Sequence, residues 1–205
     1  MTSRRDGTVR RLTAVVFDMD GTLTRPLLDF DAIAAEIGIS REVPILEAMA
    51  AMPPARRAAA EAVVVRHERA AAETGELNPG AAELLAHLRR RGLPVGLLTR
   101  NCRECVDILV GRFALPIDSV VSREDAAPKP APDGVLLNAR RFGVDPAEML
   151  MVGDYLFDLR AGSAAGSRTA LLTNGRDWAF AHEADYVLQE LTEGIALVER
   201  LLAGG

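Results

Sequence analysis

Residues 14–24 read AVVFDMDGTLT, and this stretch indicates both the fold and the chemistry of the chain. Four successive apolar residues, 14–17, are typical of a short strand that is buried on both faces. Asp18 and Asp20 follow this strand, and Gly21 gives the backbone the freedom for a sharp turn. Ligands of an open parallel sheet bind beyond the carboxyl ends of its strands, so we expect both carboxylates to lie in a functional crevice.

Short apolar runs recur along the rest of the chain. Between them, apolar residues repeat at intervals of three and four, as they do on helices with one buried face. This alternation predicts an α/β fold with a doubly wound, Rossmann-like parallel sheet and covering helices. The further strands are expected at residues 95–98, 119–121, 149–152 and 169–172, with a weaker one at 186–188.

Residues 25–78 interrupt this alternation, because they contain no strand-like run. Helical spacing occurs twice in the segment, and residues 54–74 form a long Ala-, Arg- and Glu-rich helix former. Turn-forming residues stand at both ends of the segment. The sequence therefore predicts an α/β core, residues 1–24 and 79–205, with residues 25–78 inserted as a small helical domain.

The composition excludes several classes of protein. The chain has 205 residues, of which 49% are hydrophobic, so it can bury a sizeable core. Its net charge of −5 disfavours nucleic acid as a partner, since nonspecific binding relies on a basic surface. No apolar run approaches the roughly 18–20 residues of a membrane span, and residues 1–11 lack the apolar block of a secretory signal. We therefore expect a cytoplasmic protein with no membrane partner.

A second pair of carboxylates, Asp154 and Asp158, follows the expected strand at 149–152. With Asp18 and Asp20, four acids then converge on the carboxyl edge of the sheet, where they would repel one another without a cation. Oxygen ligands favour a hard cation, and Mg²⁺ is the usual choice.

Polar residues at the ends of two other strands complete the expected crevice. Thr99, Arg100 and Asn101 close the run at 95–98 just before a helix, where a hydroxyl and free backbone N–H groups form a phosphate site. Lys129 lies between two prolines, whose stiff backbone can hold its ammonium over an anion.

In this order and spacing, these motifs resemble those of the haloacid dehalogenase superfamily. Residues 18–24 look like its first motif, Thr99 its second, Lys129 its third, and Gly153-Asp154 with Asp158 its fourth. The inserted helical segment resembles the small cap of phosphoglycolate-phosphatase-like members.

The resemblance implies a role for each residue. Asp18 would attack phosphorus to form an aspartyl phosphate, and Asp20 would protonate the leaving alcohol and then activate water. Thr99 and Lys129 would hold the phosphoryl oxygens, with Arg100 and Asn101 beside them in the substrate site. These roles suit phosphoryl transfer, in which positioning and charge neutralisation supply most of the catalysis.

The metal ligands implied by the resemblance are Asp18, the backbone carbonyl of Asp20, and Asp154. Asp158 would orient a metal-bound water or Lys129. The resemblance thus implies a Mg²⁺-dependent phosphatase that acts on a small phosphorylated metabolite, such as a phosphoglycolate-like compound or a sugar phosphate. A phosphomutase and a catalytically silent binding or regulatory protein of the same fold stay as alternatives, and the sequence predicts no oligomeric state.

Cys102 and Cys105 have a spacing found in redox and metal sites, but no second cysteine pair accompanies them. We expect both to be small apolar fillers that turnover does not require.

Overall fold

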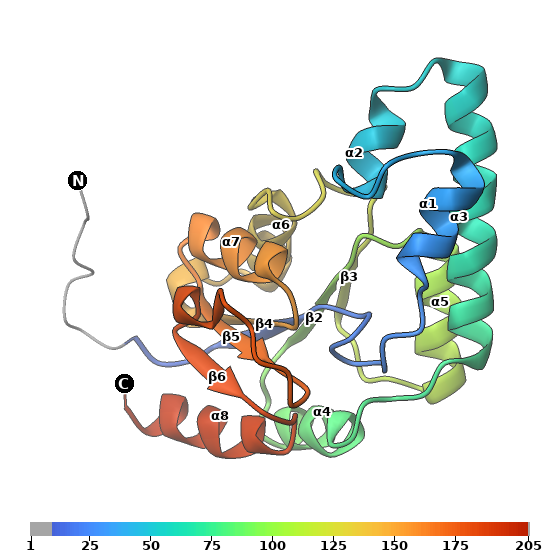
Figure 1. Cartoon of the computed structure of the whole chain (residues 1–205). Helices are drawn as coiled ribbons and strands as arrows, with labels where there is room; N and C mark the ends of the chain where they lie inside the picture. The colour runs from blue at the N-terminus through green and yellow to red at the C-terminus, as the bar shows by residue number, and fades with distance from the viewer. Residues whose placement is uncertain (1–9, 205) are drawn as a thin grey trace, which may run out of the picture.

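The computed structural model describes residues 10–204 and contains a six-stranded parallel sheet of order β3-β2-β1-β4-β5-β6 (Figure 1). The predicted α/β class, with a doubly wound parallel sheet, is confirmed. Most of the basic start of the chain lies outside the described residues. The strands are β1 (Ala14–Phe17), β2 (Val95–Leu98), β3 (Ser119–Val121), β4 (Met149–Gly153), β5 (Arg168–Leu172) and β6 (Tyr186–Leu188).

The centre of the sheet is the most deeply buried part of the fold. Every residue of β1, β2 and β4 is buried, in keeping with continuous apolar runs between two layers of helices. In β1, Phe17 pairs with Leu97 of β2 on one side and with Val152 of β4 on the other. Because the three strands are parallel and in this register, the loops that follow them meet at one edge.

Helices cover both faces of the sheet (Figure 1). One face packs against α4, α5 and α8 through a large apolar cluster, and the other packs against α6 and α7 through a smaller one. Two short 3₁₀ helices lie in the connections. The bounds are α4 (Ala81–Arg90), α5 (Arg103–Phe113), α6 (Asp133–Phe142), α7 (Leu156–Ala165), α8 (Glu193–Ala203), η1 (Pro146–Glu148) and η2 (Ala181–Glu183).

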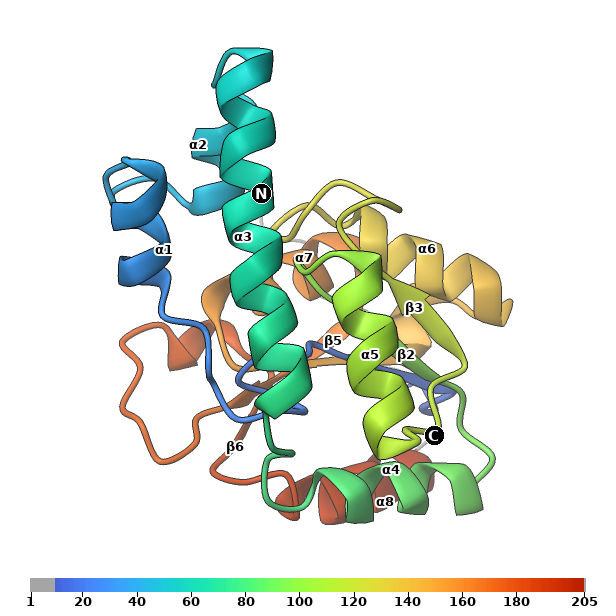
Figure 2. The same ribbon diagram turned by 90° about the vertical axis from the view of Figure 1, so that its right-hand side faces the viewer.

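The inserted segment forms three helices, α1 (Phe30–Ile37), α2 (Ile45–Ala50) and α3 (Pro54–Thr74), which we call the cap. Residues from all three helices share an apolar cluster of their own, in which Ile33 and Met49 are buried. Figure 2 shows α3 running beside α5 of the core. The cap therefore has its own small core but is attached to the rest of the molecule along α3.

The two chain crossings between core and cap lie side by side. Thr24 and Leu77 form an antiparallel bridge, and the Asn78 side-chain amide donates to the carbonyls of Gly21 (2.9 Å) and Thr22 (2.8 Å). Asn78 is buried, so these bonds satisfy polar groups that water does not reach. The crossings thus anchor the base of the cap to the turn that follows β1.

Within residues 10–204, no helix combines the length and the apolar character that a membrane crossing requires.

Candidate active site

A buried lysine and two carboxylates form the centre of the candidate site. Asp18 follows β1 directly and is 7% exposed, while Lys129 is 3% exposed in the loop between β3 and α6. The Lys129 ammonium forms ion pairs with Asp18 and with Asp158 Oδ1, the latter at 2.6 Å, and donates to the Leu98 carbonyl at 3.0 Å. These partners satisfy the buried cation.

The charges of this group depend on one another. Burial alone would lower the pKa of Lys129, but the carboxylates of Asp158 and Asp18 together raise it above its ordinary value, so the side chain stays protonated. Burial raises the pKa of Asp18 to about 6 against the opposing effect of Lys129. Asp158 also accepts a hydrogen bond from the backbone N–H of Tyr155 at 3.0 Å, which fixes its carboxylate at the start of α7.

The donor set fits a hard divalent cation. Carboxylate oxygens of Asp18, Asp154 and Asp158 lie within 4.8 Å of one another. Burial, with the charges of Asp18 and Asp158, raises the pKa of Asp154 to about 8. A bound divalent cation would relieve this repulsion among the three carboxylates. The Thr22 hydroxyl, 3.4 Å from Asp154 Oδ1, orients that carboxylate.

Gly21 leaves room for the Asp154 carboxylate. Its φ is +80°, and a Cβ at this position would lie 2.2 Å from Asp154 Oδ2. The Asp-Gly turn after β1 is therefore required both by the backbone and by the neighbouring carboxylate.

Asp20 lies in a different setting from Asp18. Burial, followed by the charges of Asp18 and Glu68, raises the pKa of Asp20 to about 8. The Asn101 side-chain amide donates to Asp20 Oδ2 at 2.8 Å. A carboxyl with a raised pKa is suited to donate a proton, as a general acid must.

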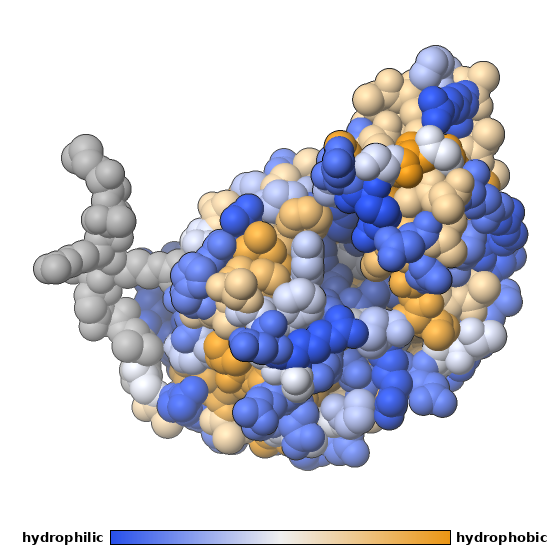
Figure 3. All heavy atoms as spheres, viewed as in Figure 1, coloured by the Kyte–Doolittle hydropathy of each residue, from blue (hydrophilic) through white to orange (hydrophobic). Residues whose placement is uncertain are grey.

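The segment after β2 contributes Thr99, Arg100 and Asn101, and each has a different setting. Thr99 is buried, and its hydroxyl accepts from the backbone N–H of Asn101 at 3.1 Å. Arg100 donates to Glu47 of α2 at 2.6 Å and also contacts the Lys129 carbonyl. The Arg100 guanidinium therefore connects the loops after β2 and β3 to the cap. Figure 3 shows a recess between the cap and the core.

Sequence reasoning missed a buried ion pair next to this site. Glu68 of α3 is 4% exposed, and the Arg123 guanidinium donates to its two oxygens at 2.6 and 2.8 Å. The signal that could have found Glu68 is its place in a helical stripe of buried residues. That stripe consists of Ala60, Val64, Glu68, Ala71 and Ala72.

Two arginines of the cap helix α3, by contrast, form ion pairs away from the aspartates of the candidate site. Arg66 pairs with Glu36 and Arg69 with Glu104, and both arginine side chains are exposed. They form solvated helix faces, as expected for charged residues on a long surface helix.

Cys102 and Cys105 are both buried, as expected of small apolar residues. Burial raises the pKa of both thiols, which is the opposite of what activates a cysteine nucleophile. Their position beside Glu68 was not expected from the sequence.

Comparison with known proteins gives consistent matches. A family model described as haloacid dehalogenase-like hydrolase matches residues 12–166. A haloacid dehalogenase-like hydrolase domain-containing protein of Arabidopsis thaliana is 36% identical, with 79% of this chain and 71% of that protein covered. N-acetylmuramic acid 6-phosphate phosphatase of Pseudomonas putida is 30% identical over 80% of this chain and 84% of its own length.

Two further matches are a relative aligned over a shorter stretch and a solved structure with the same fold. Phosphoglycolate phosphatase of Escherichia coli is 33% identical over 57% of this chain and 49% of its own length. The crystal structure of a hydrolase from Pseudomonas syringae superposes with a TM-score of 0.78 at 22% identity and covers 92% of this chain and 98% of that one.

Proposed function

The chain belongs to the haloacid dehalogenase-like hydrolases, and on this premise we propose that it is a Mg²⁺-dependent phosphatase that hydrolyses a small phosphorylated metabolite through an aspartyl-phosphate intermediate. The family and its phosphatase-named members make the chain a hydrolase of phosphate esters. The metal, the intermediate, the residue roles and the substrate are the proposal.

One observation carries the proposal: the Lys129 ammonium lies between the buried carboxylates of Asp18 and Asp158 at the carboxyl edge of the sheet. An adjacent cation keeps Asp18 ionised, so its free oxygen can act as the nucleophile. The same ammonium can bind the phosphoryl oxygens, where charge accumulates during transfer. Asp158 holds Lys129 in place and acts as a positioning residue.

Asp20 serves as the general acid and base. With a raised pKa it can protonate the leaving alcohol, and the carboxylate left behind can then accept a proton from the water that attacks the aspartyl phosphate. Asn101 orients Asp20 through the hydrogen bond from its amide. The Thr99 hydroxyl accepts from the Asn101 backbone N–H and can donate its own proton to a phosphoryl oxygen. The backbone N–H groups of Cys102 and Arg103 donate to Glu68 and Glu124 instead, so the free N–H groups expected from the sequence are not found at the start of α5.

The proposed ligands of Mg²⁺ are Asp18, Asp154 and the backbone carbonyl of Asp20. The Asp158 carboxylate lies next to those of Asp18 and Asp154. When bound, the ion would neutralise charge on the attacking carboxylate and on the phosphoryl group. The fit rests on the three clustered carboxylates and on the room that Gly21 leaves for Asp154.

The substrate is proposed to be small. The Arg100–Glu47 contact holds α2 beside the catalytic loops, so the cap limits the size of what reaches Asp18. Phosphoglycolate-like compounds and sugar phosphates are the foremost candidates, in line with the names of the phosphatase relatives. A cytoplasmic location also stays a prediction.

The test is a panel of phosphorylated metabolites assayed for release of inorganic phosphate, with and without Mg²⁺. The proposal expects Mg²⁺-dependent release from at least one small monoester. A phosphomutase would instead return a rearranged phosphate ester without stoichiometric phosphate release. Absence of both reactions would favour a catalytically silent protein.

A further inference from the structure

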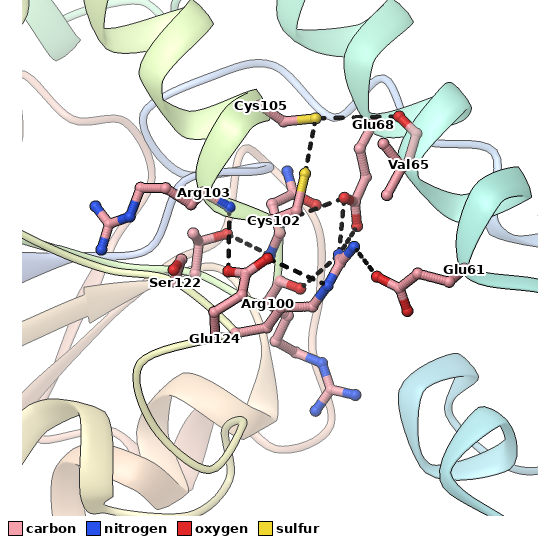
Figure 4. Close-up of polar contacts among 12 residues, drawn as sticks. Glu61, Val65, Glu68, Arg100, Cys102, Arg103, Cys105, Ser122 and Glu124 are labelled. Atoms are coloured by element: carbon pink, nitrogen blue, oxygen red, sulfur yellow. Dashed lines mark hydrogen bonds and ion pairs between the residues drawn. The ribbon is translucent and has the colours of Figure 1, made fainter. Parts of the chain in front are cut away.

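A second cluster of candidate ligands lies outside the active site, between α3 and the start of α5. Glu68, Cys102 and Cys105 are all buried, and one ligand atom from each lies within 4.8 Å of the others. The two Sγ atoms are 3.1 Å apart, and Glu68 Oε2 accepts from the backbone N–H of Cys102 at 3.2 Å. Figure 4 shows the two thiols and the carboxylate facing one another. None of these three side chains performs a step of the proposed hydrolysis, although the charge of Glu68 contributes to the raised pKa of Asp20.

We propose that these three residues form a binding site for a thiophilic divalent cation of the zinc class, here called the thiol–glutamate site. Two thiolates are soft ligands that favour Zn²⁺ over Mg²⁺ or Ca²⁺. Three protein ligands with water at the remaining position is an arrangement known for open zinc sites. Binding releases one proton from each thiol to solvent, because the thiolate is the ligand.

Arg123 supports this site electrostatically. Its guanidinium donates to both oxygens of Glu68, at 2.6 and 2.8 Å, and to Glu61 at 2.6 Å. Two thiolates and the Glu68 carboxylate carry three negative charges, which a divalent cation and Arg123 neutralise together. The hydrogen bonds from Arg123 also fix the orientation of the Glu68 carboxylate. Metal-binding carboxylates are usually held by hydrogen bonds of this kind.

The approach to the site favours a cation. Cys102 lines a surface pocket of about 560 Å³ together with Val65 and Arg103. The pocket is also lined by four acidic residues, Glu61, Glu104, Asp107 and Glu124. Glu61 and Glu104 form ion pairs with Arg123 and Arg69, so the attraction of a metal ion to this surface rests mainly on Asp107 and Glu124.

An ion bound at the thiol–glutamate site would connect the cap to the core. Glu68 belongs to the cap helix α3, Cys105 belongs to α5 of the core, and Cys102 follows Asn101, which contacts Asp20. An ion at the thiol–glutamate site would therefore link cap and core next to the catalytic loop. Because it binds the folded arrangement, it would raise the midpoint temperature of unfolding.

The experiment is a titration of the reduced full-length chain with Cd²⁺ in excess Mg²⁺, which occupies the hard-ligand site. We expect one Cd²⁺ per chain, a thiolate-to-cadmium charge-transfer band in the ultraviolet, and a higher unfolding midpoint. Cys102 and Cys105 are the two cysteines of the sequence, so the band reports on this pair alone. The double variant Cys102→Ser with Cys105→Ser should lose the band and the thermal shift while its turnover stays within a few-fold of the parent.

Glu68→Gln tests the third ligand, and Glu61→Gln is its matched control. Both glutamates pair with Arg123, but Glu61 is not among the three clustered ligands. We expect Glu68→Gln to weaken Cd²⁺ binding by at least about tenfold and Glu61→Gln to leave it within a few-fold.

Three results would overturn the proposal. The first is a parent protein without the charge-transfer band. The second is a band of equal affinity in Glu68→Gln. The third is a Cys102–Cys105 disulfide in protein purified without reductant, which would assign the pair to redox chemistry instead.

Discussion

The variant Gly21→Ala tests whether activity depends on the position of the Asp154 carboxylate, apart from the backbone strain that the alanine introduces. The new Cβ would lie 2.2 Å from Asp154 Oδ2, whereas ordinary contacts begin near 3.4 Å, so the carboxylate must retreat by about 1 Å. A misplacement of about 1 Å in a catalytic group costs on the order of 100-fold in rate. We therefore expect phosphate release by Gly21→Ala to fall about 100-fold and to need more Mg²⁺ for saturation.

Gly166→Ala is the matched control for this change. Gly166 has φ +87°, close to the +80° of Gly21, but a Cβ there meets nothing within 4 Å. Both variants carry the strain of a left-handed alanine, about 1–2 kcal/mol, so urea unfolding should show similar losses of stability. The reasoning fails if both folded variants hydrolyse phosphate esters at rates within a few-fold of each other.

Three further predictions follow from the same geometry. EDTA should abolish phosphate release and added Mg²⁺ should restore it, while Ca²⁺ should support little turnover because it accepts looser coordination; full activity in metal-free buffer would contradict the carboxylate site. Arg123→Met should lower the free energy of unfolding by about 3–5 kcal/mol, because it leaves Glu68 buried without its ion-pair partner. Arg69→Met breaks an exposed ion pair between α3 and Glu104 of α5, and it should cost less than about 1 kcal/mol in the same urea titration. Small soluble phosphate monoesters should be hydrolysed far faster than a folded phosphoprotein, and comparable rates would show that the cap does not limit access to Asp18.

The sheet could be predicted from the sequence because its strands are short, apolar and buried on both faces. β1, β2 and β3 begin and end at the predicted residues, and β4 and β5 are each one residue longer than predicted. The weak apolar run at 186–188 is also a strand, β6, at the edge of the sheet. The local sequence is enough to predict an element when the whole segment keeps one periodicity of apolar residues and one degree of burial.

The cap helices were predictable from spacing, but their attachment to the core was not. The middle of α3 packs in the cap cluster through Val64, and its last turn packs in the core cluster through Ala72. Glu68 lies between these two contacts and meets Arg123, which is 55 residues away in sequence. A charged residue on a helix usually indicates a solvated face, and only the tertiary contact shows that this one is buried.

The candidate site, like the cap, could be predicted from the sequence only in part. The motifs indicated which residues to expect at the edge of the sheet, because parallel strands present their following loops together. The contact of Arg100 with Glu47, which connects the catalytic loop to α2, depends on how the cap is seated. No periodicity in either segment indicates that pair.

The most direct test of the central claim compares the parent chain with Asp18→Asn in Mg²⁺, using the best substrate of the metabolite panel. The amide keeps the shape of the side chain but is a poor nucleophile, so a folded Asp18→Asn protein should release no phosphate above background. Circular dichroism and the unfolding midpoint establish that the variant is folded. Phosphate release near the parent rate by that folded variant would contradict the assignment of Asp18 as the nucleophile, and with it the aspartyl-phosphate mechanism.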